Sequence, residues 1–129
     1  MSNLAGERDV KQILVVDDEE SILTLIKYTF EDQKPDYHIT TALDGFIAMD
    51  YLRQQRFDLI LTDWQMAGMN GVELAETIRA ISPDTQILLM TGSDVSGLDG
   101  RVESLFSGWI KKPFSLAHMI NKIEQVMSQ

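Results

Sequence analysis

The chain has 129 residues, a net charge of -9 at neutral pH, 44% hydrophobic residues and no cysteine. This is the length of one domain that can bury a core without disulfides, and the missing cysteines exclude both a disulfide framework and a cysteine zinc site. The acidic balance argues against direct contact with nucleic acid, because binding to phosphates needs a basic surface.

No stretch approaches the roughly 18 apolar residues that a membrane span needs, and the first residues lack the apolar core of a signal peptide. We therefore expect a cytoplasmic protein that makes no membrane contact. Residues 1–10 are polar and are expected to form a flexible N-terminus. Residues 11–129 are expected to form a single domain.

The first part of the chain alternates between strand and helix patterns. Residues 13–16 are a continuous apolar run, which is typical of a strand covered on both faces. The run ends in four acidic residues, 17–20, and apolar residues at helical spacing follow over 22–30. A second, short strand is predicted at 37–42.

The middle of the chain repeats this alternation. Asp44 marks the start of a helix whose buried face covers 47–52. A third strand covers 59–62 and is followed directly by Asp63. After a loop, a third helix is predicted over 72–81, and it ends at a Ser-Pro pair because the residue before proline disfavours helix.

The last part contains two more units. Residues 86–90 predict a fourth strand that ends at Thr91, and glycines punctuate the following segment, so only a short or irregular helix is expected near 101–106. Trp109 begins a brief fifth strand. The final helix, over 116–126, shows a strong amphipathic pattern, with the preceding serine, Ser115, as its N-cap.

Strands that alternate with helices predict an α/β fold, a doubly wound five-stranded parallel sheet with helices on both faces. Right-handed crossovers and the flavodoxin-like strand order 2-1-3-4-5 place the first and third strands side by side at the centre. Ligands of such sheets bind outside the carboxyl ends of the strands, where the side chains of several strands meet.

Polar residues follow four of these strand ends: Asp17 and Asp18, Asp63, Thr91 and Lys112. Crowded carboxylates repel one another unless a cation lies between them, and donors that are all oxygen suit Mg²⁺. A metal, an ammonium group and a hydroxyl group together meet the needs of phosphoryl transfer. The pattern therefore predicts that Asp63 is a nucleophile that forms an aspartyl phosphate.

Each residue taken alone also has a plain structural interpretation. The acidic run 17–20 would cap and charge a helix N-terminus. Thr91 would be an ordinary strand-end residue, and Trp109 would belong to the core. The conjunction of these residues at four strand ends is far less probable by chance than any single one of them.

The chain resembles the receiver domain of bacterial two-component response regulators over about residues 12–127. The matching stretches are VVDDEESI, LTDWQMAGMNG, MTG and WIKKPF. The resemblance implies that Asp63 is phosphorylated by a histidine kinase or a phosphotransfer protein. It also implies that Asp18 and Asp63 bind Mg²⁺ together with the backbone carbonyl of Gln65, and that Asp17 helps through water.

The resemblance further implies contacts of Thr91 and Lys112 with the phosphoryl oxygens, a cis peptide bond between Lys112 and Pro113, and an aromatic switch at Trp109. Phosphorylation would then change the face made by the fourth helix, the fifth strand and the fifth helix. A partner protein, or a second copy in a homodimer, would read that face.

The chain departs from the family pattern in three places. Ala67 stands where the family usually has proline, so that loop is expected to be less rigid. Phe106-Ser107 replaces the usual Gly-Ala before the fifth strand, and glycines at 97 and 100 make the fourth-helix region unusual. These changes leave the phosphorylation chemistry intact and concern the output surface.

Three other functions are alternatives to that of a signalling module that is not an enzyme. A nucleotide or flavin module would carry a phosphate-cradling loop after the first strand, where this chain is acidic. A Mg²⁺-dependent phosphohydrolase would need an acid or base shortly after the nucleophile, where Trp64 and Gln65 stand. A receiver that works by binding alone would not need the complete set of site residues present here.

Overall fold

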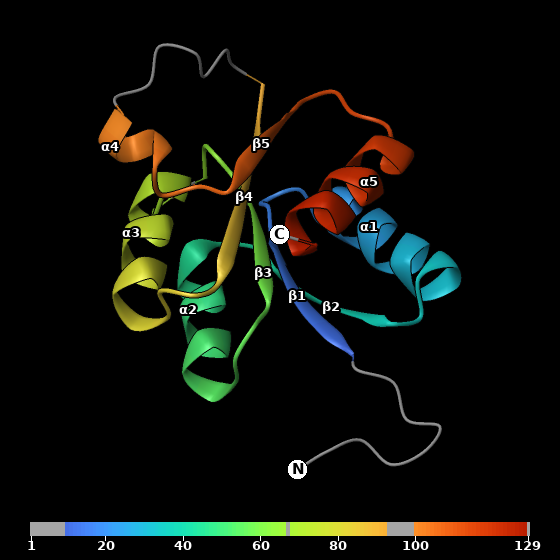
Figure 1. Ribbon diagram of the computed structural model, residues 1–129, viewed down its shortest axis with the longest axis horizontal. Coiled ribbons are helices and arrows are strands. Elements are labelled where there is room, and N and C mark those ends of the chain that lie inside the picture. Colours follow the sequence, from blue (N-terminus) through green and yellow to red (C-terminus); the bar gives the residue numbers. More distant parts are fainter. Residues whose placement is uncertain (1–9, 67, 93–99, 129) are drawn as a thin grey trace.

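Five parallel strands form one sheet with helices on both faces in the computed structural model (Figure 1), which describes residues 10–66, 68–92 and 100–128. The strand order is β2-β1-β3-β4-β5, which confirms the predicted fold. The strands are β1 (Lys11–Val16), β2 (Tyr37–Ala42), β3 (Leu59–Asp63), β4 (Gln86–Thr91) and β5 (Gly108–Lys111). The helices are α1 (Glu20–Gln33), α2 (Gly45–Gln54), α3 (Gly71–Ile81), α4 (Gly100–Glu103) and α5 (Leu116–Met127).

Two apolar layers sandwich the sheet. Helices α1 and α5 cover one face, and α2 and α3 cover the other (Figure 1). Along β1, Ile13 and Val15 pack towards α1 and α5, whereas Leu14 and Val16 pack towards α2 and α3. All four side chains are fully buried. Because both faces are covered, β1 consists of a continuous apolar run there.

The strand register brings the polar strand ends to one edge of the sheet. Val16, the last residue of β1, pairs with Thr62 in β3, so Asp17 and Asp63 follow at the same level. On the other side of β3, Asp63 pairs with Met90, the residue before Thr91. The carboxyl ends of the central strands therefore lie together, as the strand order predicts.

Side-chain caps begin three of the helices. The carboxylate of Asp44 accepts a hydrogen bond from the Ile47 amide at 2.8 Å, and the Ser115 hydroxyl accepts one from His118, so both predicted N-caps are confirmed. Helix α3 begins with a capping box between Asn70 and Glu73, in which each side chain accepts a hydrogen bond from the other residue's backbone amide.

The short helix expected near 101–106 is confirmed as α4, which covers four residues and ends at Glu103, because the Leu105 and Phe106 amides bond to carbonyls three residues back and tighten the chain into turns. The alternative interpretation of Trp109 as a core residue is wrong, since this residue is 38% exposed. The expectations for residues 1–9, for Ala67 and for the glycine at 97 lie outside the described residues.

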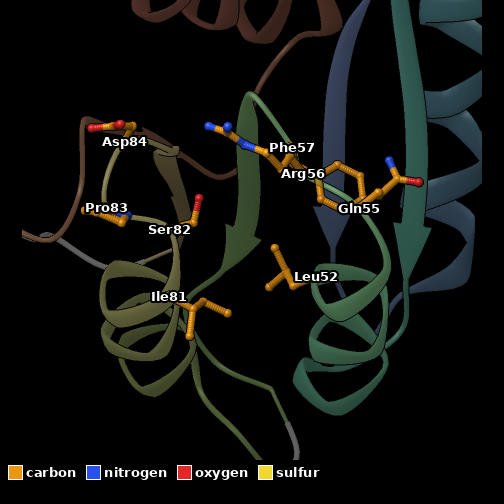
Figure 2. Close-up of a pocket in the computed structure, with 8 residues that line it drawn as sticks. All are labelled: Leu52, Gln55, Arg56, Phe57, Ile81, Ser82, Pro83 and Asp84. Atoms are coloured by element: carbon orange, nitrogen blue, oxygen red, sulfur yellow. The ribbon is translucent and has the colours of Figure 1, made fainter.

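A cavity of about 320 Å³ lies at the opposite end of the sheet from the polar strand ends. Leu52 of α2 and Ile81 of α3 face each other across it (Figure 2). None of the predicted site residues lines this cavity. Within the described part of the chain, no helix combines the length and the apolar composition needed to cross a bilayer.

Candidate functional site

Three carboxylates converge at the carboxyl edge of the sheet. Asp17, Asp18 and Asp63 each offer an oxygen, and these oxygens all lie within 4.8 Å of one another. Asp17 is fully buried after β1, Asp18 is exposed, and Asp63 ends β3 in a half-buried position. The set contains only carboxylate oxygens, which are the donors that Mg²⁺ prefers.

Asp17 is held in place by its own backbone and by the start of α1. Its amide donates to the Ala42 carbonyl at 3.1 Å, and its carboxylate accepts a hydrogen bond from the Glu19 amide at 2.9 Å. Glu19, the N-cap of α1, makes no capping bond with its own side chain. The acidic run therefore does more than cap a helix, because Asp17 points its second oxygen towards Lys112.

Lys112 reaches from the end of β5 to two of the carboxylates. Its Nζ lies 3.2 Å from Asp17 Oδ2 and 3.4 Å from Asp63 Oδ1. Its amide donates to the Thr91 carbonyl at 2.7 Å, which fixes the base of the side chain beside β4. The peptide bond between Lys112 and Pro113 is cis, as the resemblance implies.

The site shifts the pKa values of its lysine and of its central carboxyl. Burial raises the pKa of Asp63 above its ordinary value; the charge of Lys112 works against this rise, and that of Asp17 adds to it. Burial alone would lower the pKa of Lys112, but its hydrogen bond to Asp17 and the charges of Asp17 and Asp63 raise it. Lys112 therefore stays protonated and neutralises part of the cluster.

A cavity of about 230 Å³ opens beside Asp63, lined by Asp63, Trp64, Gln65, Thr91, Gly92 and Lys112. A water molecule takes about 30 Å³ of liquid volume, so the cavity has room for a phosphoryl-sized group with its hydration. Thr91 is buried in its wall, and Lys112 is partly exposed there. Carboxylate, hydroxyl and ammonium groups thus share one hollow.

The loop after Asp63 folds back on its own start. The Gly71 amide donates to the Trp64 carbonyl at 2.9 Å, and a Cβ on Gly71 would lie 2.5 Å from the Asp63 carbonyl oxygen. Only glycine therefore fits at the start of α3. The Trp64 amide donates to Met90 of β4 at 2.9 Å, which ties the beginning of the loop to the sheet.

The structure places most of the sequence-predicted residues together. Asp17, Asp18 and Asp63 form the carboxylate cluster, and Gln65, Thr91 and Lys112 line the cavity with Asp63. Trp109 is not among the residues lining that cavity. The roles of all seven residues stay predictions.

Sequence reasoning missed a second set of residues that supports the loop. Phe46 contacts Gly68, and Met69 contacts Gly45, so the start of α2 meets the loop after Asp63. The available signal was a pair of matching dipeptides, Gly-Phe at 45–46 and Gly-Met at 68–69. Nothing in their spacing shows that the two pairs meet.

The sequence matches the response regulator receiver domain family model over residues 13–124. It is 31% identical over 119 residues to the response regulator receiver protein CpdR of Brucella abortus, covering 92% of this chain and 98% of CpdR. It is 32% identical over 122 residues to the alkaline phosphatase synthesis transcriptional regulatory protein PhoP of Bacillus subtilis, covering 91% of this chain and 48% of PhoP. The chain therefore spans nearly all of CpdR and about half of PhoP.

Solved structures show the same fold. Chemotaxis protein CheY4 of Vibrio cholerae superposes with a TM-score of 0.82 at 29% identity, covering 91% of this chain and 98% of CheY4. Response regulator TrrA of Thermotoga maritima, solved in complex with Mg²⁺ and BeF, superposes with a TM-score of 0.80 at 30% identity. That match covers 91% of this chain and 99% of TrrA.

Proposed function

Because this chain belongs to the response regulator receiver domain family, and is thus a signalling module of two-component systems, we propose that it accepts a phosphoryl group on Asp63. The donor would be a cognate histidine kinase or a phosphotransfer protein. The observation that carries this proposal is the convergence of three carboxylates with Lys112, whose Nζ lies 3.4 Å from Asp63 Oδ1.

Asp63 is the best placed of the three carboxylates to act as the nucleophile. It lines the 230 Å³ cavity, whereas Asp17 is fully buried and is engaged by the Glu19 amide and by Lys112. Asp18 is exposed and does not line that cavity. An incoming phosphoryl group entering the cavity therefore meets Asp63 together with Lys112 and Thr91.

The donor set fits Mg²⁺, since it consists of oxygens on neighbouring strand ends. Asp18, Asp63 and the backbone carbonyl of Gln65 would hold the ion, with Asp17 acting through water. When bound, Mg²⁺ supplies positive charge that offsets the repulsion between carboxylates and phosphoryl oxygens. TrrA, a protein 30% identical to this chain, was solved in complex with Mg²⁺ and BeF, which supports the proposal that this chain also binds Mg²⁺.

In the transfer step, an Asp63 carboxylate oxygen attacks the phosphorus of a phosphohistidine. A P–O bond forms, the P–N bond breaks, and its electron pair leaves with the imidazole nitrogen. Lys112 would bind one phosphoryl oxygen with its ammonium group, and Thr91 would donate a hydroxyl hydrogen bond to another. Both groups stabilise charge on the phosphoryl oxygens without taking part in bond exchange.

The test is phosphorylation with acetyl phosphate and Mg²⁺. Intact-mass measurement should show one added phosphoryl group that base and hydroxylamine remove. Asp63→Asn should abolish the adduct, whereas Asp84→Asn, an exposed carboxyl at the other end of the sheet, should retain it. An adduct that persists in the Asp63→Asn variant would place the nucleophile elsewhere.

A further inference from the structure

A reciprocal contact joins the start of α2 to the loop after Asp63. A Cβ built on Gly68 would lie 2.8 Å from Cε2 of Phe46, and a Cβ built on Gly45 would lie 2.9 Å from Cβ of Met69. Both distances are shorter than side chains tolerate. Each glycine therefore makes room for the bulky residue that follows the other glycine, and we call these four residues the glycine clasp.

The backbone of Gly68 strengthens this interpretation. Gly68 has a φ of +83°, a conformation that side chains of L-residues rarely adopt. Phe46 is 58% exposed and belongs to neither of the two apolar clusters of the described core. A large aromatic side chain that contributes little to the core, yet contacts a glycine in the loop, is placed to restrain that loop.

The clasped loop carries parts of the proposed site. Between β3 and α3 it contains Trp64 and Gln65, which line the cavity beside Asp63. At its far end the Gly71 amide bonds back to the Trp64 carbonyl at 2.9 Å. The clasp acts between these points, at Gly68, to which neither the sheet nor α3 donates or accepts a hydrogen bond among the described backbone contacts.

The clasp itself rests on a fixed support. Helix α2 begins at Gly45, and the Asp44 carboxylate caps it by accepting a hydrogen bond from the Ile47 amide at 2.8 Å. Phe46 therefore projects from the first turn of a capped helix, which holds its backbone in place. A support built on a regular element positions a binding group more accurately than a support built on another loop.

We propose that Phe46 is a positioning residue for the phosphoacceptor loop, holding Gly68 so that the Gln65 carbonyl is presented to Mg²⁺. The inference rests on the proposed function, because it concerns the same metal site. Without the ring, the loop would have to lose conformational freedom when the metal binds, and this cost would appear as weaker binding. Loss of an outer support of a metal site weakens affinity by about tenfold or more.

The experiment compares Phe46→Ala with the wild type by two readouts that do not involve phosphorylation. Hydrogen exchange of the Gly71 amide in the metal-free protein should become faster, and the Mg²⁺ dissociation constant from calorimetry should rise by about tenfold. Phe46→Tyr keeps the ring and should restore both values. Tyr28→Ala removes a comparably exposed aromatic from α1, 66% exposed, and should change neither value.

A second variant keeps the inference testable by another route. Gly68→Ala should force the ring of Phe46 away, since the new Cβ would meet it at 2.8 Å. The double variant with Phe46→Ala should then weaken Mg²⁺ binding by less than the product of the two single effects. Multiplicative effects, or an unchanged Gly71 exchange rate and Mg²⁺ affinity in Phe46→Ala, would overturn the inference.

These outcomes are separate from those that test the proposed function. If the wild type binds Mg²⁺ but acetyl phosphate leaves Asp63 unmodified, the phosphoacceptor assignment fails while both readouts of the clasp remain measurable. If Asp63 is phosphorylated and Phe46→Ala behaves as the wild type, the assignment stands and the clasp has no positioning role.

Discussion

Among the ion pairs of the described residues, Lys112 is the one cation that contacts the cluster of Asp17, Asp18 and Asp63. Its side chain is 22% exposed and that of Asp17 is fully buried, so removal of the ammonium group leaves a buried carboxylate without its partner. We expect Lys112→Met to keep the fold but to lower the free energy of unfolding in chelator by about 2 to 3 kcal/mol.

Urea denaturation with and without Mg²⁺ measures this prediction. Millimolar Mg²⁺ should return part of the loss in Lys112→Met, because the metal replaces the missing positive charge. Lys111→Met is the matched control, since Lys111 is the exposed neighbour and forms none of the ion pairs found here. A loss of equal size in both variants would show that the cluster does not depend on Lys112.

Tyr37 gives a prediction about pH. Its ring packs against Phe30 with centroids 5.5 Å apart, and burial, followed by the charge of Glu124, raises the pKa of its hydroxyl above the ordinary value. The unfolded chain therefore ionises at this residue first as the pH rises above about 10. Stability from neutral Tyr37 is complete below that pH and is lost as the pH rises through the folded-state pKa.

Tyr37→Phe should remove this alkaline loss. Urea unfolding of both proteins between neutral pH and about pH 11 should show a stability difference that shifts in favour of the phenylalanine variant only above about pH 10. Other groups titrate alike in both proteins and cancel in the difference. A difference that stays constant over the whole range would contradict the assigned direction of the pKa shift.

At the level of single residues, most of the candidate site could be predicted from the sequence. Asp17, Asp63 and Thr91 lie at or directly after apolar strands, and parallel strand order brings such ends to one edge. The contact of Phe46 with Gly68 could not be predicted. It joins residues on different elements and depends on the positive φ of Gly68, which no periodic pattern records.

Arg79 of α3 connects three segments at the end of the sheet remote from the carboxylates. Its guanidinium donates to the Leu105 carbonyl at 3.2 and 3.0 Å, to the Pro83 carbonyl at 3.0 Å and to the Thr85 carbonyl. The helix is thereby tied to the turn before β4 and to the turn before β5. The guanidinium thereby supplies hydrogen-bond donors to backbone carbonyls that lie outside the strands and receive none from strand pairing.

We expect Arg79→Met to lower the free energy of unfolding by about 2 to 3 kcal/mol, since hydrogen bonds from a charged group are lost and their carbonyls are left without this donor. Arg79→Lys should recover only part of the loss, because an ammonium group lacks the fork that reaches several carbonyls. Chemical denaturation measures both. Arg53→Met, which removes the exposed pair with Asp50, should cost far less.

Element boundaries were predictable where burial and pairing coincide. The apolar run 13–16 predicted the core of β1, but the strand begins at Lys11 because the main chain of Lys11 and Gln12 still pairs with Tyr37 and His38. The hydrophobic pattern of a sequence indicates which side chains are buried, whereas the start of a strand is defined by its backbone hydrogen bonds. The same separation holds at α4, because Leu105 and Phe106 pack against the core although the helix ends at Glu103.

At the scale of the molecule, phosphorylation is expected to alter the output face, which we define as the surface of α4, β5 and α5. Trp109 lies on this face in β5 and is 38% exposed, so its ring can turn without repacking of the core. If Thr91 moves towards a phosphoryl group, Trp109 should turn inwards. In a Trp64→Phe variant, beryllofluoride with Mg²⁺ should then reduce acrylamide quenching of Trp109 fluorescence.

Hydrogen exchange and sedimentation velocity test whether the output face becomes ordered and whether two copies of the chain then associate. Amides over residues 100–111 should gain protection with beryllofluoride, and a homodimer, if it is the reader of the face, should appear in sedimentation velocity. Asp63→Asn provides the control, because the mimic has no carboxylate to bind. Unchanged quenching and protection in the wild type, despite bound beryllofluoride, would place the output on another surface.

The overall topology was predictable because few arrangements satisfy right-handed crossovers and bury every apolar strand. The lengths of the elements were less predictable from the sequence.

The short edge strand β5 limits how two molecules can associate. This edge strand has only four residues, which at about 3.3 Å per residue is little more than 13 Å of free main chain. A long, flat edge would invite neighbouring molecules to add their own strands, and a short one discourages such growth. The β5 edge therefore offers a neighbouring molecule little main chain to pair with, so that pairing of two copies through this edge would depend on side chains rather than on an added strand.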